Sequence, residues 1–156
     1  MKHDLSDILK RVINMKTDQE MLSSILKTTQ MGQVGIRSVM GTAKSPKFRR
    51  ALESQLKEYD SIEDEAHAIA GTMDWELPEL RPGQKMMADM MTRMMLHFGG
   101  SDSKIAGMMI QGNTRGMIKG LKNRHQYPRR DSRVDILSQK LLDTETSNIR
   151  QMQPFL

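Results

Sequence analysis

The sequence predicts an all-α protein, a four-helix bundle in which one of the connections is long. Apolar residues recur at three- and four-residue spacing along most of the 156-residue chain. Aromatic residues make up only 4% of the chain and methionines number 16, so aliphatic and thioether side chains must fill the interior. The balance of 37% apolar to 28% charged residues fits one domain with one core. These features favour helices packed on helices.

Helix caps and helix breakers divide the chain into six predicted helices. Thr17 and Ser45 are suitable N-cap residues, and Pro46 suits a first helical turn. The segment "DWELPELRPG", residues 74–83, interrupts the periodicity and indicates a long crossing segment. We expect helices over residues 4–14, 18–43, 46–73, 84–98, 102–123 and 132–153. The helix over 46–73 is expected to bury the apolar side chains of Phe48, Leu52, Ile62, Ala66, Ile69 and Met73.

These elements are expected to form two parts. Residues 1–16 are an amphipathic N-terminal arm, whose apolar stripe should dock on the body or on another subunit. Residues 17–156 form the bundle, built from a hairpin over 17–73, a crossover over 74–100 and a second hairpin over 101–153.

Each long helix carries polar residues near the middle of its apolar face, when residues are placed at about 100° intervals. These residues are Gln33, Gln55, Tyr59, Asn113, Glu145 and Asn148. A buried polar group without a partner costs about 1–3 kcal/mol. We therefore expect these side chains to satisfy one another in a central polar network.

The two hairpins also resemble each other, because Gly32-Gln33 in the first corresponds to Gly112-Asn113 in the second. With the helix order, this pattern resembles the ferritin-like superfamily, above all small bacterial bundles of unknown function that carry Gly-Glu at both places. The stretch "SPKFRRALESQLKEYDSI" followed by "GTMDWELP" is similar to ferritin-like proteins of the spore coat F type. The resemblance covers residues 18–153 and implies a ferritin-like bundle, with a spore-associated setting from the coat proteins.

The resemblance also implies a di-iron or di-manganese centre, which takes a carboxylate from each of two helices and a Glu-x-x-His pair from each of the other two. This chain has the neutral amides Gln33 and Asn113 where the family has two glutamates, and Asn148 where it has a histidine. Glu145 is the one central carboxylate left. We therefore expect a degenerate centre, no cofactor and no enzymatic activity. The alternative is a ferritin-like redox or storage protein that binds iron or manganese, including a metal-dependent oxidase.

An alternative metal site starts from "DEAH", residues 64–67, in which Asp64 and His67 lie one helical turn apart. Both lie on the flank of their helix, so we expect a solvated or inter-helix charge pair. In the alternative, Glu63 or His67 would join Glu145 in a displaced iron or manganese site. The chain has no Cys, which excludes thiolate ligands and thiolate catalysis.

Six methionines follow the crossing segment at helical spacing: Met86, Met87, Met90, Met91, Met94 and Met95. We call these six residues the Met stripe. Met side chains fill irregular gaps and suit adaptable interfaces, so we expect the stripe to pack on the bundle and against a second subunit. Ligation of Cu(I) by the thioethers is the alternative.

The remaining sequence signals concern partners and location. The net charge of +5 would suit an anionic partner, and the basic run over 122–133 is expected to be a solvated loop. A nucleic-acid surface is the alternative, through Arg124, Arg129, Arg130 and Arg133. No signal peptide and no 18-residue apolar run are recognisable, so we expect a cytoplasmic protein without a membrane span. The favoured function is a structural or interaction module that forms homo-oligomers, with a further protein partner as a possibility.

Overall fold

The computed structural model describes residues 4–97, 99–128 and 130–156, and over these residues the chain is all-helical, without a strand. The α-helices are α1 (Leu5–Ile13), α2 (Asp18–Met40), α3 (Pro46–Thr72), α4 (Pro82–Leu96), α5 (Asp102–His125) and α6 (Ser132–Met152), followed by a 3₁₀ turn, η1 (Gln153–Phe155). The predicted class and helix order are confirmed. The helix ends differ from the prediction by at most three residues.

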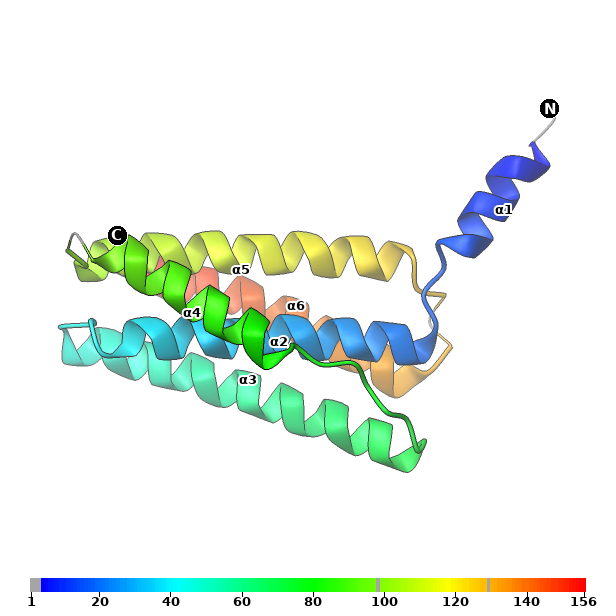
Figure 1. Ribbon diagram of the computed structural model, residues 1–156, viewed down its shortest axis with the longest axis horizontal. Helices are drawn as coiled ribbons and strands as arrows, with labels where there is room; N and C mark the ends of the chain where they lie inside the picture. Colours follow the sequence, from blue (N-terminus) through cyan, green and yellow to red (C-terminus); the bar gives the residue numbers. More distant parts are fainter. Residues whose placement is uncertain (1–3, 98, 129) are drawn as a thin grey trace.

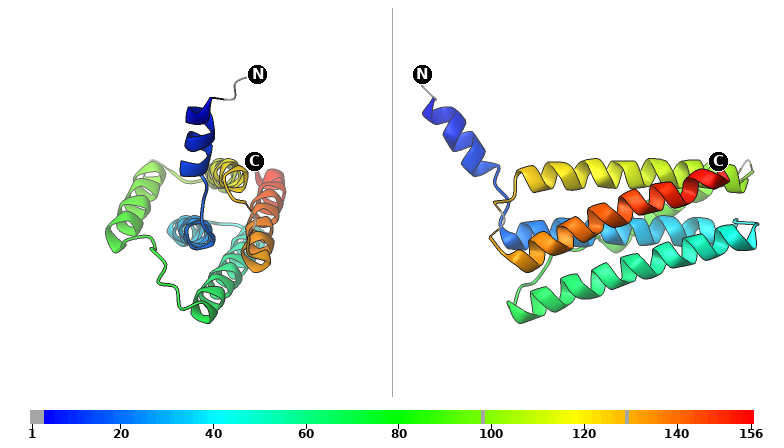
Figure 2. Two further views of the ribbon diagram at one scale, coloured as in Figure 1. Left: turned by 90° about the vertical axis from the view of Figure 1, so that its right-hand side faces the viewer. Right: turned by 180° about the vertical axis from the view of Figure 1, so that it is seen from behind.

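Four long helices, α2, α3, α5 and α6, lie side by side in an elongated body (Figure 1). The pairs α2/α3 and α5/α6 pack as neighbours in sequence, and α3 also packs on α6 and α2 on α5. Aliphatic side chains such as Leu22, Leu26, Ile36, Leu52 and Ile62 fill the space between them. In the end view of Figure 2, α4 lies outside this body, against α2.

Side-chain caps begin the long helices as expected. The hydroxyls of Thr17, Ser45 and Ser101 each accept a hydrogen bond from the backbone N–H three residues later, at 3.1, 3.4 and 3.1 Å. The carboxylate of Asp102 also accepts the backbone N–H groups of Lys44 and Ser45, at 2.8 and 2.9 Å. The start of α5 is thereby tied to the turn between α2 and α3.

The end of α3 corrects one prediction. Met73 was expected in the core, but its side chain is 45% exposed. The helix ends at Thr72, and Asp74 adopts a left-handed backbone with φ of 54°. The helical spacing on which the prediction depended therefore ends one residue before Met73.

Helix α1 projects beyond the end of the body (Figure 1), and none of its residues is buried. The hydrogen bond from Lys16 N to Gln126 O, 2.7 Å long, holds the base of the connecting segment. The expected docking of the arm on its own body is therefore wrong. Its docking on another subunit stays a prediction.

None of the described helices is both long enough and apolar enough to cross a membrane.

Candidate functional site

The centre of the body contains a compact polar cluster from three helices. Tyr59 on α3 donates its hydroxyl hydrogen to Asn113 Oδ1 on α5, at 2.9 Å. Asn148 Nδ2 on α6 lies 3.4 Å from both Tyr59 Oη and Asn113 Oδ1 and donates to them. Asn113 Nδ2 donates to the backbone oxygen of Met109 at 2.8 Å. All three polar side chains are buried, and with Glu145, whose carboxyl interacts with Tyr59, the structure brings together four of the six residues expected at the centre.

Glu145 lies beside this cluster and is only 2% exposed. Its Oε2 atom has no hydrogen-bond partner among the described residues. Burial raises the pKa of the Glu145 carboxyl from 4.5 to about 8, because the charged form loses its hydration. Burial also raises the pKa of the Tyr59 phenol, and the nearby Glu145 charge raises it further. At neutral pH the centre is therefore occupied by a neutral acid, a neutral phenol and two amides.

Two glycines make room for these side chains. A Cβ atom on Gly32 of α2 would lie 2.6 Å from the ring of Tyr59, and one on Gly116 of α5 would lie 2.8 Å from Glu145 Oε1. Gly112, the predicted counterpart of Gly32, has no atom within 4 Å of such a Cβ. The glycine of the second hairpin that makes room for a central side chain, as Gly32 does in the first, is therefore Gly116. The sequence match between the hairpins pointed to Gly112 instead. The available signal was a glycine on an otherwise apolar helix face.

Gln33 lies outside the central cluster, which corrects the predicted network. Its Nε2 donates to Asp60 Oδ1 at 2.8 Å and lies 3.5 Å from Glu63 Oε1. Its neighbour Gln30 donates to Glu63 Oε2 at 3.0 Å and accepts the backbone N–H of Leu80 at 3.0 Å. The long glutamine side chains reach the seam between α2 and α3, where two carboxylates offer charged acceptors. Gln30, not singled out from the sequence, links this seam to the crossover.

Gln55 also lies apart from the cluster. It is buried, and its Nε2 donates to Gln151 Oε1 on α6 at 2.9 Å. Its own Oε1 has no hydrogen-bond partner among the described residues. Gln55 and Asn148 both line an open groove of about 990 Å³ between α3 and α6. Charges of both signs also line this groove, from Glu58, Lys140, Asp143 and Arg150.

The residues of the alternative metal site are not brought together. His67 Nε2 lies 2.6 Å from Glu79 Oε1 on the crossover, in an exposed hydrogen-bonded contact. Glu63 is engaged by the glutamines of α2, and Glu145 faces the centre. Within the described part of the chain, no three acidic or histidine side chains are grouped so as to hold a metal ion. Of the two expectations for "DEAH", a solvated or an inter-helix pair, His67 fits the solvated one, because its partner Glu79 lies on the crossover and both side chains are exposed.

Helix α4 presents the Met stripe to solvent, with its six side chains 51% to 69% exposed. The expected packing of the stripe on the bundle is therefore wrong. The shielded positions are Lys85, Ala88, Asp89, Thr92 and Leu96. Ser38 on α2 donates to Asp89 Oδ1 at 2.6 Å, and this bond, with a second from Arg93, lowers the pKa of the Asp89 carboxyl. Specific polar contacts to α2 thus fix the orientation of α4 and leave its apolar face uncovered.

Side chains of the basic run over residues 122–133 mainly form contacts with α6 within the chain. Arg124 is an ion-pair partner of Asp135 at 3.2 Å and donates to Ser138 Oγ, and its side chain is only 14% exposed. Arg130 is exposed. Arg129 lies outside the described residues.

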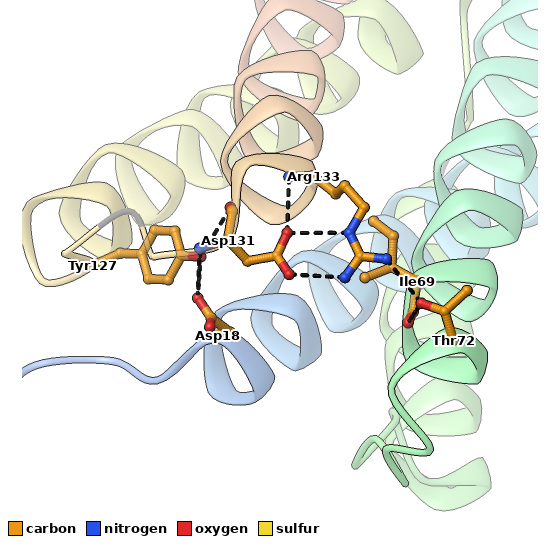
Figure 3. A network of polar contacts seen from close by, with 6 residues as sticks. All are labelled: Asp18, Ile69, Thr72, Tyr127, Asp131 and Arg133. Atoms are coloured by element: carbon orange, nitrogen blue, oxygen red, sulfur yellow. Dashed lines mark hydrogen bonds and ion pairs between the residues drawn. The ribbon is translucent and has the colours of Figure 1, made fainter.

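Arg133 belongs to a network that joins three helices at one end of the body (Figure 3). Its guanidinium pairs with Asp131 at 2.9 Å and donates to Thr72 Oγ1 of α3 at 2.9 Å. Tyr127 donates its hydroxyl hydrogen to Asp18 of α2, which also accepts the backbone N–H of Asp131 at 3.2 Å. This network has a structural role that no local sequence pattern indicated.

Comparison with known proteins brings no match: no family model matches the chain, no curated protein matches its sequence, and no solved structure matches its fold. The ferritin-like and spore coat resemblances therefore depend on the quoted sequence motifs and remain predictions.

Proposed function

We propose that this protein is a non-enzymatic helical interaction module of the ferritin-like type, with a degenerate metal centre, that acts as a homo-oligomer. The observation that supports this most is the composition of the centre. Two hard divalent cations need several anionic oxygens and imidazole nitrogens at fixed separation. The chain instead places Tyr59, Asn113 and Asn148 there, bonded to one another, with a carboxyl whose pKa is about 8.

The donor set therefore does not fit the family's metal pair. The neutral amides supply no negative charge, and the phenol donates its hydrogen to Asn113. Glu145 alone would have to lose its proton in a buried environment before it could bind a cation. A polar cluster of this kind has a simpler use, because hydrogen-bonded groups in a core fix the register of the helices around them.

Elemental analysis of the purified protein tests the proposal. We expect far less than one equivalent of iron or manganese per chain after growth with both metals, and the same content in the Glu145→Gln variant. Two equivalents per chain in the wild type, lost in Glu145→Gln but kept in a variant at an exposed acid, Glu53→Gln, would refute it.

One observation favours an iron- or manganese-binding alternative: the buried Oε2 of Glu145 has no partner within the described residues. Titration of the protein with Mn²⁺ distinguishes the two functions. In the alternative, Mn²⁺ displaces a proton from Glu145 and binding tightens as the pH rises through about 8. The nucleic-acid alternative has less support, because Arg124 and Arg133 are held in internal ion pairs.

A further inference from the structure

Among the residues that the structure describes, two apolar surfaces lie uncovered on the folded protomer. The first, which we call the arm stripe, consists of α1 side chains that are 48% to 77% exposed: Leu5, Ile8, Leu9, Val12 and Ile13. The second is the Met stripe of α4. Large exposed apolar patches on a soluble protein usually mark interaction sites. One chain therefore carries two such sites, on two helices that lie outside the four-helix body (Figures 1 and 2).

The two stripes match in length. The arm stripe covers about 12 Å of helix and the Met stripe about 14 Å, at 1.5 Å per residue. Paired Met residues one turn apart give a broad, adaptable surface that accepts the branched side chains of another helix. Neither stripe contains a charged residue that contact would bury.

The arm stripe cannot lie along the Met stripe of its own chain. The segment over residues 14–16 extends to about 11 Å at most, and its base is held at Gln126. The middle of α1 therefore stays within about 20 Å of Thr17. The middle of the Met stripe is level with Ser38, which binds Asp89 and lies about 30 Å along α2. The two surfaces can pair only between different chains.

We propose that the arm stripe of one copy docks on the Met stripe of a second copy, and that the exchange is reciprocal. This inference rests on the proposed interaction function and names its partner, which is the chain itself. A reciprocal exchange closes with twofold symmetry and leaves neither stripe exposed. Each contact buries on the order of 1,000 Å², so the pair of contacts reaches the size of a stable protein interface.

The charges on α1 favour a protein partner over a lipid surface. Helices that bind anionic membranes carry Lys and Arg on the polar face and often an aromatic anchor. The polar side of α1 instead carries Asp7 with Lys10 and Arg11, a net charge of only +1 that the N-cap residue Asp4 offsets, and the helix has no aromatic residue.

Sedimentation velocity of the full-length protein tests the exchange. We expect a dimer of about 36 kDa, twice the 17.9 kDa of one chain. Leu9→Asp on α1 and Met90→Glu on α4 should each weaken dimerisation by about a hundredfold, because each change affects both contacts of the symmetric dimer. Ile136→Asp and Met31→Glu are matched controls at exposed positions of α6 and α2, and they should leave the dimer intact.

A mixture of the two interface variants gives the decisive result. The intact arm of the Met90→Glu chain can dock on the intact Met stripe of the Leu9→Asp chain. In this heterodimer one contact is intact, and the other holds both substitutions but can be lost only once, so the mixture should dimerise more tightly than either variant alone. Because the chain has no Cys, the double variant Ile8→Cys/Met91→Cys should also form an inter-chain disulfide, and neither single variant should form one as efficiently.

Several outcomes would overturn the inference. One is a monomer at protein concentrations up to about 1 mM. A second is a dimer weakened by only one of the two interface variants, which would mean that like stripes pair with like. A third is a monomer that floats with phosphatidylglycerol vesicles and loses this binding in Leu9→Asp alone, which would identify α1 as a membrane anchor. Metal analysis of the same samples tests the degenerate centre separately, and a dimer held by like stripes would overturn the exchange while leaving the proposed homo-oligomer intact.

Discussion

Replacing Glu145 with glutamine tests the chemistry of the buried centre most directly. In the unfolded chain this carboxyl has its ordinary pKa of 4.5, and burial raises the pKa to about 8 in the folded chain. Below pH 4.5 both states hold the proton. Between pH 4.5 and 8 only the folded state holds it, so the free energy of unfolding falls as the pH rises. Above about pH 8 both states are ionised and the decrease ends.

The size of this decrease follows from the two pKa values. A tenfold change in proton affinity corresponds to about 1.4 kcal/mol, so the range from 4.5 to about 8 amounts to about 5 kcal/mol. This is a large part of the free energy of unfolding of a typical domain, which is roughly 5–15 kcal/mol. Glutamine has nearly the same shape and cannot ionise. Relative to the wild type, Glu145→Gln should therefore gain about 5 kcal/mol between pH 4.5 and pH 9.

Urea unfolding followed by circular dichroism at 222 nm, at several pH values from 4.5 to 9, measures this difference. All other ionisable groups are the same in the two proteins, so their contribution cancels when the two curves are subtracted. The control Glu53→Gln changes an exposed acid on α3 and keeps Glu145, so it should retain the slope of the wild type. Parallel curves for the wild type and Glu145→Gln would refute the reasoning, as would a carboxyl ¹³C titration of Glu145 with a midpoint near 4.5.

Two further predictions concern the helix contacts. Gly32→Ala should destabilise the protein by about 1–3 kcal/mol, because its Cβ would lie 2.6 Å from the hydrogen-bonded ring of Tyr59. Thermal unfolding measures the loss. The matched control Gly35→Ala, whose Cβ would have no atom within 4 Å, should instead stabilise α2 by about 0.5–1 kcal/mol. Equal effects of the two substitutions would contradict the close contact. Tyr127→Phe should lower the free energy of unfolding in urea by about 1–2 kcal/mol, since the Asp18 carboxylate loses its phenolic donor. A Tyr127→Phe variant as stable as the wild type would show that this hydrogen bond contributes nothing.

The sequence alone located the helices and placed their ends to within three residues. Thr17 and Ser45 were recognisable caps because a hydroxyl at the start of a helix satisfies a free backbone N–H of the first turn, which is a local interaction. The periodicity of apolar residues likewise located the core face of each long helix. It also placed Tyr59, Asn113 and Asn148 at one level, because residues near the middle of four packed helices meet at the middle of the body.

Only the tertiary structure shows which hydrogen-bond partner each polar side chain has and which face of a helix is buried. Gln33 lies on the predicted face, yet its flexible side chain donates to the carboxylates of α3. Residue spacing along a helix does not predict which of several nearby acceptors a long side chain will bind. The hydrophobic pattern predicted that the Met stripe would pack on the bundle. Hydrogen bonds from Ser38 to Asp89 and from the Leu80 backbone to Gln30 instead hold α4 with the Met stripe facing solvent. Periodicity shows that a helix has an apolar face. Which surface covers that face depends on contacts between residues distant in sequence, and those form only in the folded chain.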